Sequence, residues 1–414
     1  MNNLNIDNKI ITLDNGLKVI TIKKDTQIAS LNIGINIGSL YEKDSERGLS
    51  HFIEHMLFKG TKTRNNEELN KKLEFLGGDY NAYTDNSNTV FTVSCIEEEI
   101  GNAIELLGDM LMNSVMDENE IVKEQGVVLS EIKASKDDIE DLSFKRTSEV
   151  AFLKSPLRYD VLGTEETVSN FKRNDIVTYY NRYYTPDNAT LVLVSSLNHS
   201  DAIKLIKDVF KEWKGTVGEK IKIHYEKNHS GLFTSYKKQI EQSTVIYLYS
   251  MENLEEEDEM PLKILNHKLG ESANSILFRE LRENRGLAYD VYTSLDLSKD
   301  VRIMNIFTAV SEESIDETIN VINDCIKKIK SKDIVFDEET LELMKKIHKT
   351  SVLSTLEDSS DLCNYVLNQS LENRPIDDFI DDMKKLEKLK EDDIHRVCNK
   401  FLEGATIHIL KSEE

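Results

Sequence analysis

Residues 48–60 read GLSHFIEHMLFKG, a short apolar stretch that is bounded by a glycine at each end and contains two histidines and a glutamate. On a helix, residues four apart share a face, so His51 and His55 can present two imidazoles to one metal ion. Glu54 lies on the same side of that helix, where it can hold and deprotonate a water molecule on the metal. An ordinary amphipathic helix with a few polar positions would show the same residues. The motif by itself therefore leaves both interpretations open.

A third metal ligand has to come from elsewhere in the chain, because a catalytic zinc usually has three protein ligands and one open position. The predicted helix 118–135 offers Glu124 and Glu131, which are seven residues apart and therefore lie on one face. Residues 127–129 and Ile132 form the apolar stripe that packs this helix inward. Two carboxylates near a buried stripe are costly unless a cation or a donor satisfies them, and a metal would do so. Two exposed glutamates on an acidic protein are the alternative at this point.

The composition describes a globular chain rather than a fibrous or disordered one. Of its 414 residues, 39% are hydrophobic and 31% are charged, and the length suits about two or three domains. The net charge of −23 argues against a nucleic-acid partner, because phosphate binding needs a concentrated basic patch. No apolar run is long enough to span a membrane, the first residues do not resemble a targeting segment, and the four cysteines are widely scattered. These features predict a cytoplasmic protein with no membrane association and no disulfide framework.

The order of predicted strands and helices occurs twice along the chain. Matching motifs in the two halves are 117–120 and 337–339, 174–176 and 392–394, and 189–193 and 405–409. Their roughly constant separation favours an internal duplication. We therefore expect an α+β fold of two homologous domains, each a mixed β-sheet with helices packed on one face. The predicted domains are residues 1–214 and 232–414, and the glycine-containing segment 215–231 is the predicted linker.

The first half resembles a known family of metallopeptidases. Residues 48–60, together with 123–132 (KEQGVVLSEI), closely resemble the family that includes pitrilysin, insulin-degrading enzyme and the mitochondrial processing peptidase. The order His-x-x-Glu-His is the inverzincin signature of such enzymes. The similarity continues through residues 162–166 and 183–188, so it spans most of the first half.

The resemblance implies a zinc endopeptidase whose site can be assigned residue by residue. In this family the third zinc ligand lies on a helix at the position of Glu131, so Zn²⁺ is expected on His51, His55 and Glu131. The family's supporting glutamate matches Glu124. Glu54 is expected to act as general base toward water and then as general acid toward the leaving amine.

Two further segments resemble the family's substrate-binding elements. Residues 81–84 (NAYT) resemble an edge strand that pairs with the peptide backbone, so Asn81 and Ala82 are expected to bind substrate. Arg282 and Tyr289 are seven residues apart, the spacing at which the family uses an arginine and a tyrosine to hold the peptide. Without the resemblance, the first segment could equally be a strand that is only paired within its own sheet, Arg282 would be a surface residue and Tyr289 would be a partly buried strand residue.

The second half has lost the metal motif, because residues 265–272 (LNHKLGES) have no glutamate and histidine where they are needed. One metal site per chain is therefore expected. Two halves of this length resemble the short bacterial-type members, in which two chains enclose a chamber. The resemblance thus implies a homodimer, or a heterodimer with a related chain, that cleaves short or unfolded peptides. A protease dedicated to one precursor peptide and a catalytically silent chamber-forming subunit are the alternatives.

Overall fold

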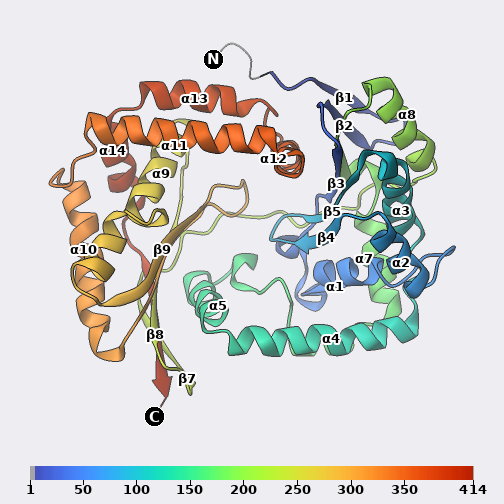
Figure 1. The fold of residues 1–414 in the computed structure, drawn as a ribbon. Coiled ribbons are helices and arrows are strands. Elements are labelled where there is room, and N and C mark those ends of the chain that lie inside the picture. Colours follow the sequence, from blue (N-terminus) through green and yellow to red (C-terminus); the bar gives the residue numbers. More distant parts are fainter. Residues whose placement is uncertain (1–4, 414) are drawn as a thin grey trace. The chain divides into compact units, whose positions relative to one another are not determined.

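The computed structural model describes residues 5–413, which form two compact units that are not continuous in sequence (Figure 1). The first unit contains the residues up to Ile132, Asp160–Lys222 and Thr350–Ile380. The second contains Lys133–Tyr159, Ile223–Lys349 and the residues from Asp381 onward. Each unit has its own β-sheet and its own hydrophobic core. Within residues 5–413, no helix has the length and apolar character needed to cross a membrane.

The first unit is built on a six-stranded mixed sheet with the strand order β1-β2-β6-β3-β5-β4. β2 and β6 are parallel, and the other neighbouring pairs are antiparallel. β4 is an edge strand, paired with β5. The strands are β1 (Asn8–Thr12), β2 (Lys18–Lys23), β3 (Ile28–Ile35), β4 (Asp79–Thr84), β5 (Thr89–Ile96) and β6 (Ala189–Ser195).

One face of this sheet packs on helices that carry the main core of the unit. Side chains alternate between the two faces of a strand, and Leu31 and Ile33 of β3 are fully buried in this core. Helices α1, α3 and α8 contact the strands from this side, and α1 also contacts α7. The helices of this part of the chain are α1 (Leu49–Leu57), α2 (Asn66–Phe75), α3 (Ile100–Asn113), α4 (Glu118–Asp137), α6 (Glu165–Asn170), α7 (Arg173–Tyr183) and α8 (His199–Phe210).

The opposite face of the same sheet is covered by α12 (Ser359–Leu371), which comes from the second half of the chain. The helix lies so close to β3 that a Cβ added at Gly34 would be 2.8 Å from Cδ1 of Leu371. Beside it, Asn32 Nδ2 donates a hydrogen bond of 2.6 Å to Asn364 Oδ1. Glycine at position 34 therefore permits the close approach of α12.

The second unit has a five-stranded mixed sheet with the order β7-β11-β8-β10-β9. β7 and β11 are parallel, and the other pairs are antiparallel. The strands are β7 (Gly231–Lys238), β8 (Ser243–Ser250), β9 (Ala288–Asp296), β10 (Ile303–Val310) and β11 (Thr406–Glu413). The helices of this part of the chain are α5 (Ile139–Ala151), α9 (Glu256–Asn266), α10 (Ile315–Lys330), α11 (Glu338–Glu357), α13 (Asp378–Lys388) and α14 (Glu391–Phe401).

Helix α5 comes from the first half of the chain but packs on β8 and β11 of the second unit. Its Ser143 hydroxyl shares a hydrogen bond of 2.6 Å with the hydroxyl of Thr244. Each half of the chain thus contributes one helix to the unit that the other half mainly forms. α5 joins the second unit, and α12 joins the first. The predicted fold class, two halves that each combine a mixed sheet with helices, is confirmed. The division of the chain at 215–231 stays a prediction. The chain passes from the first unit to the second at three points, after Ile132, Lys222 and Ile380, and the second of these falls inside this segment.

Candidate metal centre

The motif of residues 48–60 forms α1, and its apolar residues bury the helix against the core of the first unit. Phe52, Ile53 and Leu57 are fully buried, and they anchor the helix while its polar residues share another face. The helix begins after Gly48, which has φ 91° and therefore adopts a backbone conformation that favours glycine. A Cβ at this position would also lie 2.6 Å from the carbonyl oxygen of Leu162. Sterics therefore require glycine at the start of α1.

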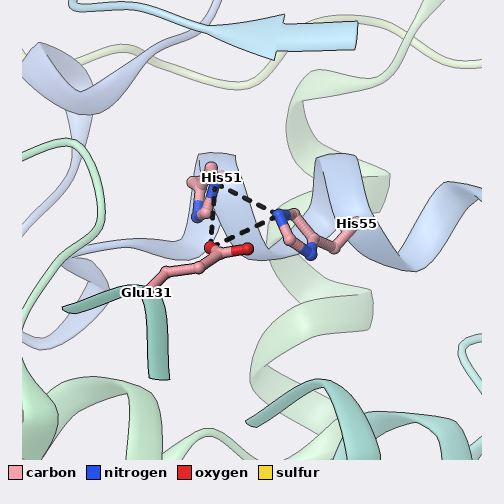
Figure 2. Close-up of side chains that lie close together, drawn as sticks. All are labelled: His51, His55 and Glu131. Carbon is pink, nitrogen blue, oxygen red and sulfur yellow. Dashed lines mark hydrogen bonds and ion pairs between the residues drawn. The ribbon is translucent and has the colours of Figure 1, made fainter. Parts of the chain in front are cut away.

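His51, His55 and Glu131 lie together, with one potential ligand atom of each within 4.8 Å of the others (Figure 2). The two Nε2 atoms are 3.2 Å apart. Oε2 of Glu131 is 3.8 Å from Nε2 of His51 and 3.7 Å from Nε2 of His55. The histidines come from α1 and the glutamate comes from α4, as the sequence predicts. Among the described residues this is the one group of three or more such side chains that can hold a metal ion.

The donor set fits zinc. Two imidazole nitrogens and one carboxylate oxygen are ligands that zinc prefers, and three protein ligands leave a fourth position for water or substrate. Burial, followed by the charge of His55, lowers the pKa of His51 to about 4, which keeps this ring in the neutral form that binds metals. The Nδ1 atom of His55 is held by Glu124 at 2.9 Å, so its Nε2 atom is left for the metal.

Glu124 supports this site from a buried position on α4. Only 3% of the residue is exposed, and its second oxygen, Oε1, forms an ion pair with the ammonium group of Lys59. Burial raises the pKa of Glu124, but the hydrogen bonds from His55 and Lys59 outweigh it, so the pKa lies below its ordinary value. Although burial opposes protonation of His55, the hydrogen bond to Glu124 and the neighbouring carboxylates raise the pKa of this ring. The contact with His55 agrees with the predicted supporting role of Glu124, which stays a prediction.

Lys59 was not predicted. It follows His55 by four residues within the same motif, so helical spacing could have indicated that it lies near Glu124. Its charge compensates the buried carboxylate, whose ionised form would otherwise be costly.

Glu54 lies beside the ligand cluster and is held by a residue of the edge strand. The carboxylate is largely buried, with 8% of the residue exposed, and burial raises its pKa. The hydroxyl of Thr84, at the end of β4, donates a hydrogen bond of 2.6 Å to Oε2 of Glu54. Thr84 belongs to the predicted substrate-binding segment, but its contact with Glu54 was not predicted.

Asn81 and Ala82 lie on β4, the edge strand of the first sheet. In the ladder they are opposite Thr92 and Phe91 of β5. The backbone N–H of Ala82 donates to the side-chain oxygen of Asn81 at 2.9 Å. The location on an edge strand agrees with the prediction, and binding of substrate there stays a prediction.

Arg282 and Tyr289 belong to the second unit and contact each other. The guanidinium carbon of Arg282 lies 4.9 Å from the ring centre of Tyr289 and 4.9 Å from that of Phe278. The two aromatic rings therefore orient the cation through cation–π contacts. Tyr289 is 75% exposed, so its ring is accessible to solvent on the side away from Arg282. The contact between Phe278 and Arg282 was not predicted. The only sequence signal for it is that Phe278 precedes Arg282 by four residues.

Replacing Glu124 with glutamine is expected to weaken zinc binding by about 10- to 100-fold. The neutral amide lacks the negative charge with which the carboxylate holds both the ring of His55 and the ammonium group of Lys59. The measurement is a competition titration against a chelator of known affinity. Glu118→Gln, an exposed glutamate in the first turn of the same helix, is the control and should bind zinc as the wild type does. Equal zinc affinity in Glu124→Gln and the wild type would remove Glu124 from the site.

The chain matches two family profiles that follow one another along the sequence. Residues 18–165 match the profile described as insulinase (peptidase family M16), and residues 170–347 match the peptidase M16 inactive domain. The second profile covers much of the half in which the metal motif is missing.

Similar proteins span most of the length of this chain. The uncharacterized zinc protease YmxG of Bacillus subtilis is 31% identical over 361 residues, which cover 85% of this chain and 85% of the relative. An uncharacterized zinc protease of Rickettsia bellii is 30% identical and covers 78% of this chain and 79% of its own length. The crystal structure of a protease from Helicobacter pylori has the same fold, with a TM-score of 0.90, 23% identity and coverage of 98% of this chain and 99% of that one.

Proposed function

This chain belongs to the insulinase family of peptidases, M16, and we propose that it is a zinc-dependent endopeptidase acting on short or unfolded peptides. The observation that carries the proposal is the convergence of His51, His55 and Glu131 from two helices, with Glu54 beside them. The resemblance to relatives named zinc proteases supports the same assignment.

The chemistry divides between the metal and the residues around it. Zinc, when bound, would lower the pKa of its water from that of bulk water to roughly 7 and would polarise the scissile carbonyl. Glu54 then accepts a proton from the attacking water and passes it to the leaving amine, so that no covalent intermediate is needed. The hydrogen bond from Thr84 fixes the carboxylate of Glu54 in one orientation.

Peptide binding is proposed to use the free edge of β4. An extended peptide can add to such an edge through main-chain hydrogen bonds, which give affinity with little dependence on sequence. Asn81 and Ala82 lie on this edge, and the N–H of Ala82 donates to the side-chain oxygen of Asn81. Thr84 connects the same strand to Glu54, which would place the bound backbone near the general base.

Removing the guanidinium of Arg282 in Arg282→Ala is expected to lower kcat/KM by about 100-fold, the effect typical of losing one donor to a developing negative charge. Zinc content should not change, because Arg282 belongs to a different unit from the ligand cluster. Arg279→Ala, which removes an exposed arginine from the same turn, is the control. Kinetics of Arg282→Ala that match those of the control would exclude Arg282 from substrate binding.

We further propose that two copies of the chain form a homodimer, or that the chain pairs with a related subunit. A cytoplasmic location is also proposed, supported by four cysteines that are all free and buried. The substrate is then a peptide rather than a nucleic acid, in line with the net charge of −23. Light scattering on the purified chain, alone and mixed with a related chain from the same genome, tests the assembly.

The proposal is tested by comparing one protein substrate in its native and its unfolded form. The unfolded form should be cleaved and the native form should resist, because an extended backbone is needed to pair with β4. Cleavage of neither form, in zinc-loaded protein, would favour a catalytically silent subunit. Cleavage of one precursor sequence alone would favour a dedicated maturation protease.

A further inference from the structure

The N-terminus of α1 is capped by a residue that lies outside the helix. The first N–H groups of a helix have no acceptor within it, and a serine, threonine or aspartate at the N-cap usually supplies one. Position 48 cannot do so, because φ 91° and the nearby carbonyl of Leu162 require glycine there. The acceptor must therefore come from another segment of the chain.

Glu42 supplies it with both oxygens of its carboxylate. Oε2 accepts a hydrogen bond of 2.8 Å from the N–H of Gly48, and Oε1 accepts one of 2.7 Å from the N–H of Ser50. Glu42 is completely buried, with 0% of the residue exposed. A negative charge at this end of a helix also interacts favourably with the helix dipole. One side chain thus satisfies two backbone donors at the start of the helix that carries the histidines.

The surroundings of Glu42 are polar but contain few charges. Arg47 is the nearby cation that favours the ionised carboxylate, and the Ser50 hydroxyl, which also hydrogen-bonds to Tyr179 at 2.8 Å, lies beside it. Burial raises the pKa of Glu42 to about 7, although the two backbone donors lower it. A buried carboxylate is an expensive way to cap a helix, since an exposed serine can do the same elsewhere. This cost indicates that the fold requires the first turn of α1 to be held in a fixed position.

The first turn of α1 contains a candidate metal ligand. His51 directly follows Ser50, whose N–H is held by Glu42, so a shift of this turn would move His51 relative to His55 and Glu131. The other histidine has its own restraint, the hydrogen bond from Nδ1 of His55 to Glu124. The ring of His51 lacks a comparable restraint on the side away from the cluster, because its Nδ1 atom is buried without a hydrogen-bond partner among the described residues.

We propose that Glu42 is a positioning residue that fixes the first turn of α1 and thereby sets the affinity of the metal site through His51. The inference rests on the proposed function only in that the cluster of His51, His55 and Glu131 binds a divalent metal. It does not depend on what substrate the chain cleaves. Glu42 is not among the three side chains that converge on the candidate metal position.

The test uses the full chain, freed of metal, with cobalt(II) as the probe. In Glu42→Gln the amide keeps one acceptor but turns an N–H₂ group toward the second backbone donor, which leaves that donor unsatisfied. Cobalt(II) is expected to bind about 10-fold more weakly or worse, and its visible absorption spectrum should change because the ligand geometry changes. Zinc affinity, measured by competition with a chelator, should fall in parallel.

A matched control removes a cap from a neighbouring helix that carries no predicted metal ligand. Asn65 caps α2 by accepting a hydrogen bond of 2.9 Å from the N–H of Glu68. Asn65→Ala should therefore lower thermal stability while leaving the cobalt spectrum and affinity unchanged. This variant separates a loss of stability from a loss of positioning.

If Glu42→Gln does not fold, Glu42→Asp serves instead, because it keeps the charge but is one methylene too short to reach both N–H groups. It should show the same changes to a smaller extent. A folded variant of either kind with the cobalt spectrum and affinity of the wild type would overturn the proposal. A wild-type chain that binds cobalt but cleaves no peptide would contradict the proposed function and leave the role of Glu42 in force.

Discussion

Glu54→Gln is expected to lower kcat by about 10²- to 10⁴-fold, the contribution typical of general acid–base catalysis. The amide has nearly the shape of the carboxylate, and its oxygen can still accept the hydrogen bond from Thr84. It cannot accept a proton from water, however. The zinc content should be that of the wild type, because Glu54 is not among the three side chains that converge on the candidate metal position.

Hydrolysis of an unstructured fluorogenic peptide, measured together with metal content, checks this result. Glu67→Gln changes an exposed glutamate in the first turn of α2 and should leave both quantities unchanged. Full activity of Glu54→Gln with zinc bound would exclude Glu54 as the general base. Loss of zinc from this variant would mean that Glu54 helps to hold the metal.

Glu131→Ala is expected to lose both metal and activity, in contrast to Glu54→Gln. Removing one of three protein ligands should weaken zinc binding by more than the roughly 10- to 100-fold expected for a residue that only supports a ligand. The alanine variant leaves His51 and His55 alone at the cluster, 3.2 Å apart between their Nε2 atoms. After dialysis against a weak chelator, the variant should contain less zinc than the wild type.

Metal analysis after dialysis, followed by a competition titration, measures this effect. Glu118→Ala, on the same helix but outside the cluster, is the control. Wild-type zinc affinity in Glu131→Ala would remove Glu131 from the ligand set and would point to another carboxylate, of which Glu124 lies nearest to His55.

The residues of the metal cluster could be predicted from the sequence, but the contacts that support them from other segments could not. His51 and His55 share a face of α1 because they are four residues apart, and the resemblance to the family selected Glu131 on the second helix. Thr84 and Glu42 reach α1 from other segments through tertiary contacts. No local pattern marks such residues, because their role depends on which segments the fold brings together.

The same holds for the fold: its strands and helices could be predicted from local sequence patterns, but the unit that each helix joins could not. Alternating strands and the internal repeat predicted two related sheet-and-helix halves, and the structure has two mixed sheets. The exchange of α5 and α12 between the units was not predicted. An amphipathic helix must bury its apolar face against some sheet, but its sequence does not state which one.

The dependence of peptide hydrolysis on zinc is tested most directly by a zinc titration of metal-free protein with peptide hydrolysis as the readout. The chain is stripped with a chelator, zinc is returned in steps, and cleavage of an unstructured peptide is followed together with bound metal. We expect no cleavage without metal, and activity that rises with bound zinc until one ion is held per chain. Cleavage by the metal-free chain at the rate of the zinc-loaded chain would contradict this expectation.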